Sequence, residues 1–133
     1  MKSSELIETV CAYVEGELEL PFALYADQMP TESGDCACFR CEPASAASRD
    51  YVDGSRLVEW NFSVYVRCLA ASEAREWAKA IVDLLDNKKI TAEDETVIVC
   101  EAETLPQYIS TDDKGATVYL SSFCAQYLQE SED

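Results

Sequence analysis

Between Leu57 and Cys68 the chain alternates between apolar and polar side chains. Every even position from Val58 to Cys68 is apolar, and polar residues occupy most of the odd positions between them. Because successive side chains on a β-strand point to opposite faces, this alternation predicts a long strand with one buried face and one wetted face. The Asp53-Gly54 pair just upstream favours a tight turn, so we expect an antiparallel partner before this strand and place the strand at the centre of a sheet.

Two other segments carry apolar residues at helical spacing. The first apolar stripe consists of Leu6, Ile7, Val10, Cys11 and Val14. The second consists of Ala74, Trp77, Ala78, Ile81, Leu84 and Leu85. We expect a first helix of three to four turns that begins at Ser3 or Ser4, and a second helix capped by Ser72 and closed by Asn87 and the two lysines after it.

The remaining apolar segments are short and favour strands. Four further strands are expected, at residues 21–28, 36–42, 96–101 and 116–128. The order helix, strand, strand, strand, helix, strand, strand predicts an α+β fold, a mainly antiparallel sheet of four to five strands with two helices packed on one face. We expect a single domain over residues 1–133, with a long loop at 43–56 and a frayed acidic tail at 129–133.

The sheet face opposite the helices is expected to be partly open. Tyr65, Tyr119 and Tyr127 are candidates for exposure on it. Because aromatic side chains are enriched where proteins contact one another, these three tyrosines are candidate subunit contacts.

The chain is strongly acidic. It has 26 acidic and 10 basic residues in 133, a formal net charge of -16. This charge repels phosphate backbones and anionic lipid, so we expect no stable nucleic-acid binding and no membrane binding. One interpretation is solubility, and another is a surface that lies near DNA without binding it. No segment is long and apolar enough to span a bilayer, and the first residues lack the apolar stretch of a secretory signal, so we expect a cytosolic product.

The sequence offers little catalytic chemistry. It contains no histidine, which excludes Ser-His-Asp and Cys-His schemes, and its acidic pairs lie in polar segments where solvent keeps them ionised. We therefore expect no enzyme activity, no catalytic residue and no cofactor. Among seven cysteines, Cys36, Cys38 and Cys41 form the single cluster that could bind zinc, although on a strand Cys41 would face away from the other two. A thiol-rich metal-binding or redox module built on these three residues is the alternative function.

Several features together carry a family resemblance. They are the amphipathic N-terminal helix, a loop ending in Y-V-D-G at residues 51–54, the alternating strand LVEWNFSVYVRC, the helix EAREWAKAIVDLLDN and two closing strands. With this combination the chain resembles the tail terminator proteins of long-tailed bacteriophages, some of which are described as minor capsid or tail completion proteins.

The resemblance implies a structural virion protein of the tail or neck, made in the cytoplasm of the bacterial host. It implies a homo-oligomer, a hexameric ring, that caps the tail tube, ends tail polymerisation and provides the head-tail joining surface. The partners would be the major tail tube protein and the head connector, and DNA would pass through an acidic lumen. Candidate interface residues on or beside the long loop are Arg49, Asp50, Tyr51, Asp53 and Arg56, since polar pairs can set the register between subunits.

Overall fold

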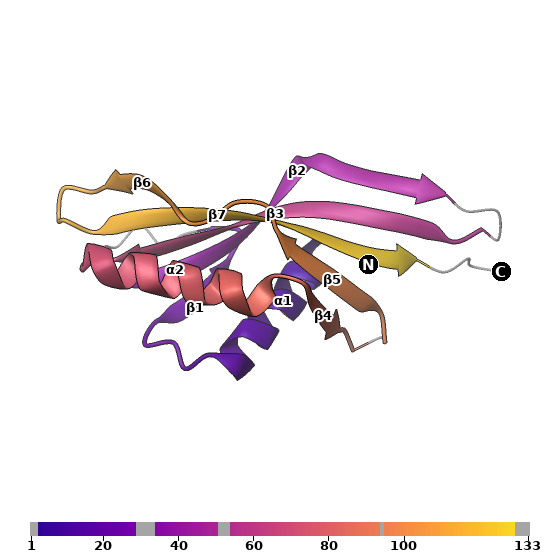
Figure 1. Cartoon of the computed structure of the whole chain (residues 1–133), viewed down its shortest axis with the longest axis horizontal. Helices are drawn as coiled ribbons and strands as arrows, with labels where there is room; N and C mark the ends of the chain where they lie inside the picture. The colour runs from indigo at the N-terminus through magenta and orange to yellow at the C-terminus, as the bar shows by residue number, and fades with distance from the viewer. Residues whose placement is uncertain (1–2, 29–33, 51–53, 94, 130–133) are drawn as a thin grey trace.

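The computed structural model describes residues 3–28, 34–50, 54–93 and 95–129 of the chain. Its elements in order are α1 (Ser3–Glu17), β1 (Ala23–Ala26), β2 (Cys36–Asp50), β3 (Arg56–Cys68), α2 (Ala71–Leu85), β4 (Lys88–Thr91), β5 (Val97–Ala102), β6 (Gln107–Thr111) and β7 (Thr117–Gln129). Both helices lie on the same side of one curled sheet (Figure 1). Within the described ranges, neither helix has the length and hydropathy to cross a membrane.

The sheet is mixed and has seven strands. Its strand order is β1-β2-β3-β7-β5-β4, and β6 pairs with β7 beside β5. Strand β1 runs parallel to β2, whereas all the other pairs are antiparallel. The α+β class with two helices is therefore confirmed, while the expected count of four to five strands is wrong.

Strand β3 lies in the middle of the sheet, as its alternation predicts. It pairs with β2 on one side and along its full length with β7 on the other, antiparallel to both. The apolar side chains at the even positions of β3 face the helices, and most of them are buried. Gly54 has a φ of 89°, the left-handed backbone that a tight turn before β3 requires.

Strand β2 is much longer than expected. The predicted loop at 43–56 is wrong for residues 43–50, because β2 continues to Asp50 after an irregularity in its register between Glu42 and Ala47. This stretch is rich in alanine and serine and shows no apolar alternation, so its strand state depends on backbone pairing with β3, which a local pattern does not reveal. Residues 51–53 lie outside the described residues, as do residues 130–133 of the predicted tail.

Two short strands were not predicted. Strand β4 occupies the lysines that we expected to close the second helix, and its Ile90 is buried. Strand β6 lies within the segment expected to be a connection between the last two strands. Both strands have too few residues to show a clear period. Helix α2 begins one residue before the expected cap, with Ala70 as its N-cap, so the capping role of Ser72 is wrong.

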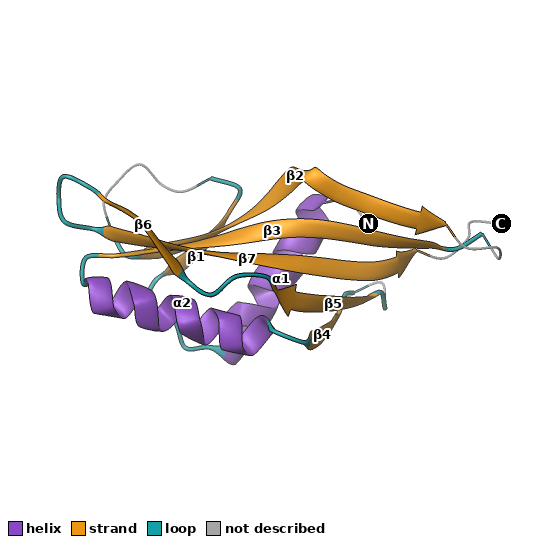
Figure 2. Ribbon diagram, turned by 45° about the horizontal axis from the view of Figure 1, so that its top comes forward, coloured by secondary structure: helices purple, strands orange, loops and turns teal. Residues whose placement is uncertain are grey.

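One core joins both helices to the sheet. Its fully buried side chains include Leu6 and Val10 from α1, Ile81 from α2 and Phe62 from β3. A helix of 15 residues spans about 22 Å, whereas a strand of 13 residues spans about 43 Å. The helices therefore cover only part of the strand length, and the end of the sheet with the β2–β3 hairpin extends beyond them (Figures 1 and 2).

Candidate functional site

The predicted interface residues of the hairpin lie at the extended end of the sheet. The backbone of Asp50 pairs with Arg56, and Arg56 in turn pairs with Gln129 at the end of β7. Arg49 pairs with Leu57 one position further in. The fold thus brings Arg49, Asp50 and Arg56 together beside the end of β7, and the Arg56 side chain is exposed. Tyr51 and Asp53 lie outside the described residues.

Tyr65 lies on the sheet face away from the helices, as predicted. Its side chain is half-buried, and the Arg40 guanidinium lies 5.8 Å from the ring centroid. Other polar contacts line the same face. The Gln126 amide donates a hydrogen bond of 2.7 Å to Glu59, and Arg67 Nε donates one of 3.0 Å to the Gly34 carbonyl. This face is therefore mixed, because Leu57, Leu120 and Leu128 lie on it beside these polar contacts and Leu128 is 50% exposed.

The exposure expected for Tyr127 is wrong. Its side chain is 4% exposed and belongs to the core. Tyr119, Phe123 and Tyr127 are four residues apart on β7, so all three share the face that the helices cover. The placement of Tyr119 on the face opposite the helices is therefore also wrong; its side chain is half-buried, and its ring meets the edge of the Tyr108 ring at a centroid distance of 6.2 Å.

Strand β6 is the surface feature that the sequence analysis missed. All five of its residues are exposed, including Tyr108 at 58% and Ile109 at 46%, and Leu105 just before it is 67% exposed. Among the described residues, β6 pairs with β7 alone, so its outer edge is open. The sequence does contain a signal for this exposed strand. The eight residues 104–111 carry no charge, although 27% of the chain is charged.

Strand β5 leads into β6 along the same edge of β7. β5 pairs with residues 123–127 of β7 and β6 with residues 117–120. At the junction, the Ser122 carbonyl accepts a hydrogen bond of 2.8 Å from the Glu103 amide, and the Ser122 amide donates one of 2.9 Å to the Thr104 hydroxyl. These bonds fix where β5 ends and position β6.

The opposite edge of the sheet is β1. It pairs only with β2 within the described part of the chain, and Ala23, Tyr25 and Ala26 are exposed. Residues 20–26 also carry no charge. Phe22, just before the strand, packs edge-on against Trp77 of α2 at 6.0 Å between ring centroids, which holds this segment to the helix layer.

The cysteines are free thiols. Burial raises the pKa of Cys11, Cys68 and Cys100 to about 12 and the pKa of Cys38 to about 11, so these groups stay protonated near neutral pH. Because β2 is a strand through this region, Cys41 lies on the face opposite to Cys36 and Cys38. Strand geometry and raised pKa values both oppose metal ligation by the three cysteines together.

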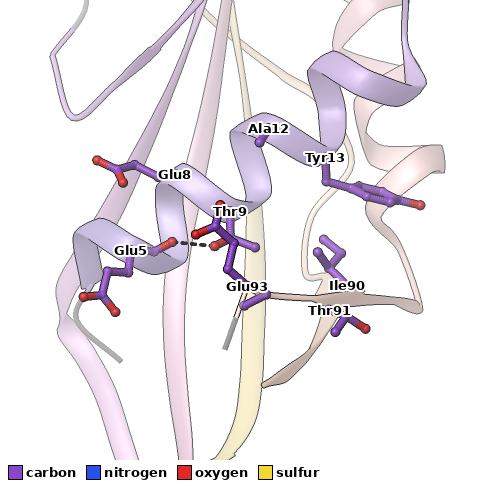
Figure 3. Close-up of a pocket in the computed structure, with 9 residues that line it drawn as sticks. Glu5, Glu8, Thr9, Ala12, Tyr13, Ile90, Thr91 and Glu93 are labelled. Atoms are coloured by element: carbon purple, nitrogen blue, oxygen red, sulfur yellow. Dashed lines mark hydrogen bonds between the residues drawn. The ribbon is translucent and has the colours of Figure 1, made fainter. Parts of the chain in front are cut away.

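A groove of about 650 Å³ lies between α1 and β4 (Figure 3). Its lining residues include Glu5, Glu8 and Glu93, together with Tyr13 and Ile90. The Thr9 hydroxyl donates a hydrogen bond of 2.8 Å to the Glu5 carbonyl within the helix. This acidic lining disfavours anionic ligands such as phosphates.

The chain has recognisable relatives. A family model described as bacteriophage tail terminator protein matches residues 11–129. No curated protein sequence matches the chain. Twenty-three chains of solved structures match it. One of them has a TM-score of 0.58 at 16% identity and covers 98% of this chain and 94% of its own, a likeness that concerns the fold alone.

Proposed function

The chain belongs to the bacteriophage tail terminator family, and from this premise we propose that it forms a ring that caps the tail tube, stops tube polymerisation and offers a joining surface to the head connector. Members of this family are structural components of the phage tail, and hence of the virion. The observation that carries the proposal is the extent of the family match, which covers residues 11–129 and so includes the whole sheet and α2.

The extended end of the sheet supports a ring. Arg49, Asp50 and Arg56 gather there beyond the helix layer, and charged residues of both signs can set the register between neighbouring copies. Tyr51 and Asp53 from the same hairpin belong to this proposed contact. Its chemistry is recognition of another protein surface, with no catalytic step.

The aromatic contacts in the proposal are Tyr65 and Tyr119. Both side chains are half-buried in the single chain, so each keeps surface that a neighbouring copy or the tail tube can cover. Tyr127 is excluded, because a side chain that is 4% exposed has almost no surface left for a partner.

The net charge supports passage of DNA through the ring. Each subunit carries a net charge of -16, so the lumen of the ring has a negative potential. This potential repels the phosphate backbone, and DNA moves through the ring without binding to it. In this proposal the tail tube protein and the connector are protein partners, and nucleic acid is a passenger.

A tube polymerisation assay tests the proposal. Purified tail tube protein of the same phage is polymerised with and without the chain, and tube lengths are measured by electron microscopy. We expect shorter tubes with extra density at one end when the chain is present. The Phe62→Ala variant, which removes a core ring, serves as a folding-impaired control. Tubes that keep elongating in the presence of excess folded chain would contradict the proposal.

A further inference from the structure

Two exposed strand edges of the sheet lack charged residues. Residues 20–26 contain β1 and residues 104–111 contain β6, and neither segment carries a charge. Another edge strand, β4, begins with Lys88 and Lys89, the kind of residue that keeps an open edge from pairing with another chain. Among the described residues, the β1 and β6 edges of this very acidic molecule therefore lack that protection.

The two uncharged edges lie at the same level of the sheet. Leu24 of β1 pairs with Ala37, and Ala37 pairs with Val66. Val66 pairs with Tyr119, which pairs with Tyr108 of β6. One continuous row of backbone partners thus runs across the sheet from β1 to β6, so a neighbouring copy placed alongside would meet β6 with its own β1 at matching height.

The strand directions also agree. β1 runs in the same direction as β2 and β7, whereas β6 runs against β7. If neighbouring copies keep the same orientation around a ring, β1 of one copy runs antiparallel to β6 of the next. Antiparallel pairing of short strands is the more favourable geometry, and it needs no inversion of either copy.

We infer that β6 of one subunit pairs with β1 of the next copy of this chain, extending the sheet from subunit to subunit around the ring. This inference rests on the proposed ring and assigns one of its contacts. The contact joins two different surfaces of the same molecule, which is the head-to-tail type that closes rings. Tyr108, Ile109 and Leu105 lose their exposure on one side, and Tyr25 on the other.

The matched height and strand directions of the two edges favour a second copy as the occupant, and charge limits where it can approach. Two molecules that each carry a net charge of -16 repel one another over most of their surfaces. The uncharged edges are places where the copies approach without an unpaired carboxylate being buried. Apolar side chains and free backbone groups supply the attraction there.

The test compares lysine substitutions at matched positions. Ile109 and Val97 are both β-branched strand residues with 46% exposure, but only Ile109 lies on the inferred contact. Assembly of wild type, Ile109→Lys, Tyr25→Lys and the control Val97→Lys is followed by analytical ultracentrifugation, from micromolar to millimolar protein, alone and after mixing with tail tubes. Circular dichroism confirms that each variant is folded.

We expect Ile109→Lys and Tyr25→Lys each to raise the concentration needed for assembly by about tenfold or more, while Val97→Lys behaves as wild type. The double variant Ile109→Lys with Tyr25→Asp places opposite charges on the two edges and should recover part of the assembly. A folded Ile109→Lys that assembles like wild type, a wild type that stays monomeric alone and on tubes, or a double variant without any recovery would each overturn the inferred pairing.

Failure of this contact is distinguishable from failure of the proposed function. If Ile109→Lys stops tube growth as well as wild type does, the β1–β6 contact is wrong and the terminator role stands. If wild type assembles and the substitutions weaken assembly, but the oligomer does not stop tube growth, the contact stands and the capping role is wrong.

Discussion

Three phenylalanine rings lie side by side across the centre of the sheet. Phe62 of β3 is stacked at 5.1 Å from Phe123 and at 6.4 Å from Phe39, and all three side chains are fully buried. The three rings come from three adjacent strands, β2, β3 and β7, so their contacts hold together segments that are far apart in the chain. Buried aromatic pairs add packing energy beyond the area that they remove from water.

Phe62→Ala should lower the free energy of unfolding by about 3–5 kcal/mol, because it leaves a cavity between the two other rings. Urea unfolding followed by tryptophan fluorescence measures the change. Phe22→Ala is the matched control, since the Phe22 side chain is only partly buried, and its effect should be smaller. Equal losses for the two variants would contradict the central place of the Phe62 ring.

The buried thiols make stability depend on alkaline pH. Burial raises the pKa of Cys100 from its ordinary value of 9.0 to about 12. The thiol therefore stays protonated in the folded chain at pH values where the unfolded chain has already lost that proton. The stabilisation is fully present below pH 9 and declines as the pH rises from 9 towards 12.

Between pH 8 and pH 10, wild type should lose about 1 kcal/mol more stability than Cys100→Ala does. Urea unfolding at the two pH values gives the change in stability with pH for each protein. Comparing these two changes removes the pH-independent effect of losing the Cys100 side chain. A variant whose stability falls as steeply as that of wild type would show that Cys100 does not titrate in the way its burial requires.

Among the elements, strands β3 and β6 differ in how they are paired and in how much they bury. β3 is paired on both sides and buries most of one face, whereas β6 is paired on one side and exposes every residue. Local opening is easiest where few buried contacts must be broken. β6 is therefore held mainly by its hairpin with β7 and by the hydrogen bonds at Ser122.

Hydrogen exchange should separate these two strands. In the dilute protein, amides of Gln107–Thr111 should exchange much faster than those of Val58–Cys68, and assembly should slow exchange in β6 and in Ala23–Ala26 together. Mass spectrometry after timed labelling measures both. The exposed residues of the β4 edge serve as the reference, and slowing at β4 alone would contradict the inferred arrangement of neighbours.

Elements with a strong local pattern could be predicted from the sequence, and the others could not. β3 and α2 each bury one face, so their apolar residues recur with the period of the element. β6 buries no residue and the second half of β2 is mostly small or polar, so neither shows a period. Tyr119 and Tyr127 were misplaced because the aromatic character of a residue does not reveal which face of the sheet the helices cover.

The candidate site depends on pairing between strands that are far apart in the sequence, which the pattern of one segment does not reveal. Arg49, Asp50 and Arg56 were predicted from their place on or beside the expected long loop, and their role at an interface stays a prediction. The match between β1 and β6 depends on the register of five strands, and residues from 23 to 120 contribute to it. Only the uncharged character of residues 20–26 and 104–111 is visible in the sequence alone.

At the scale of the whole molecule, the net charge opposes contact between copies, whereas the uncharged strand edges allow it. A net charge of -16 keeps free copies apart, while the two uncharged edges and the polar hairpin end allow contact in defined places. Such a balance favours assembly at the end of a tube, where copies are held close together, over assembly in solution. In the proposed function, this balance suits a subunit that assembles on the end of the tail tube.

The most direct measurement is the length of tails made without this chain. In a phage whose gene for the chain carries an early stop codon, electron microscopy of the lysate should show tails of variable and excessive length that lack heads, and supplying the chain from a plasmid should restore one uniform length and attached heads. Headless tails of normal, uniform length in the absence of the chain would contradict its role in ending tail growth.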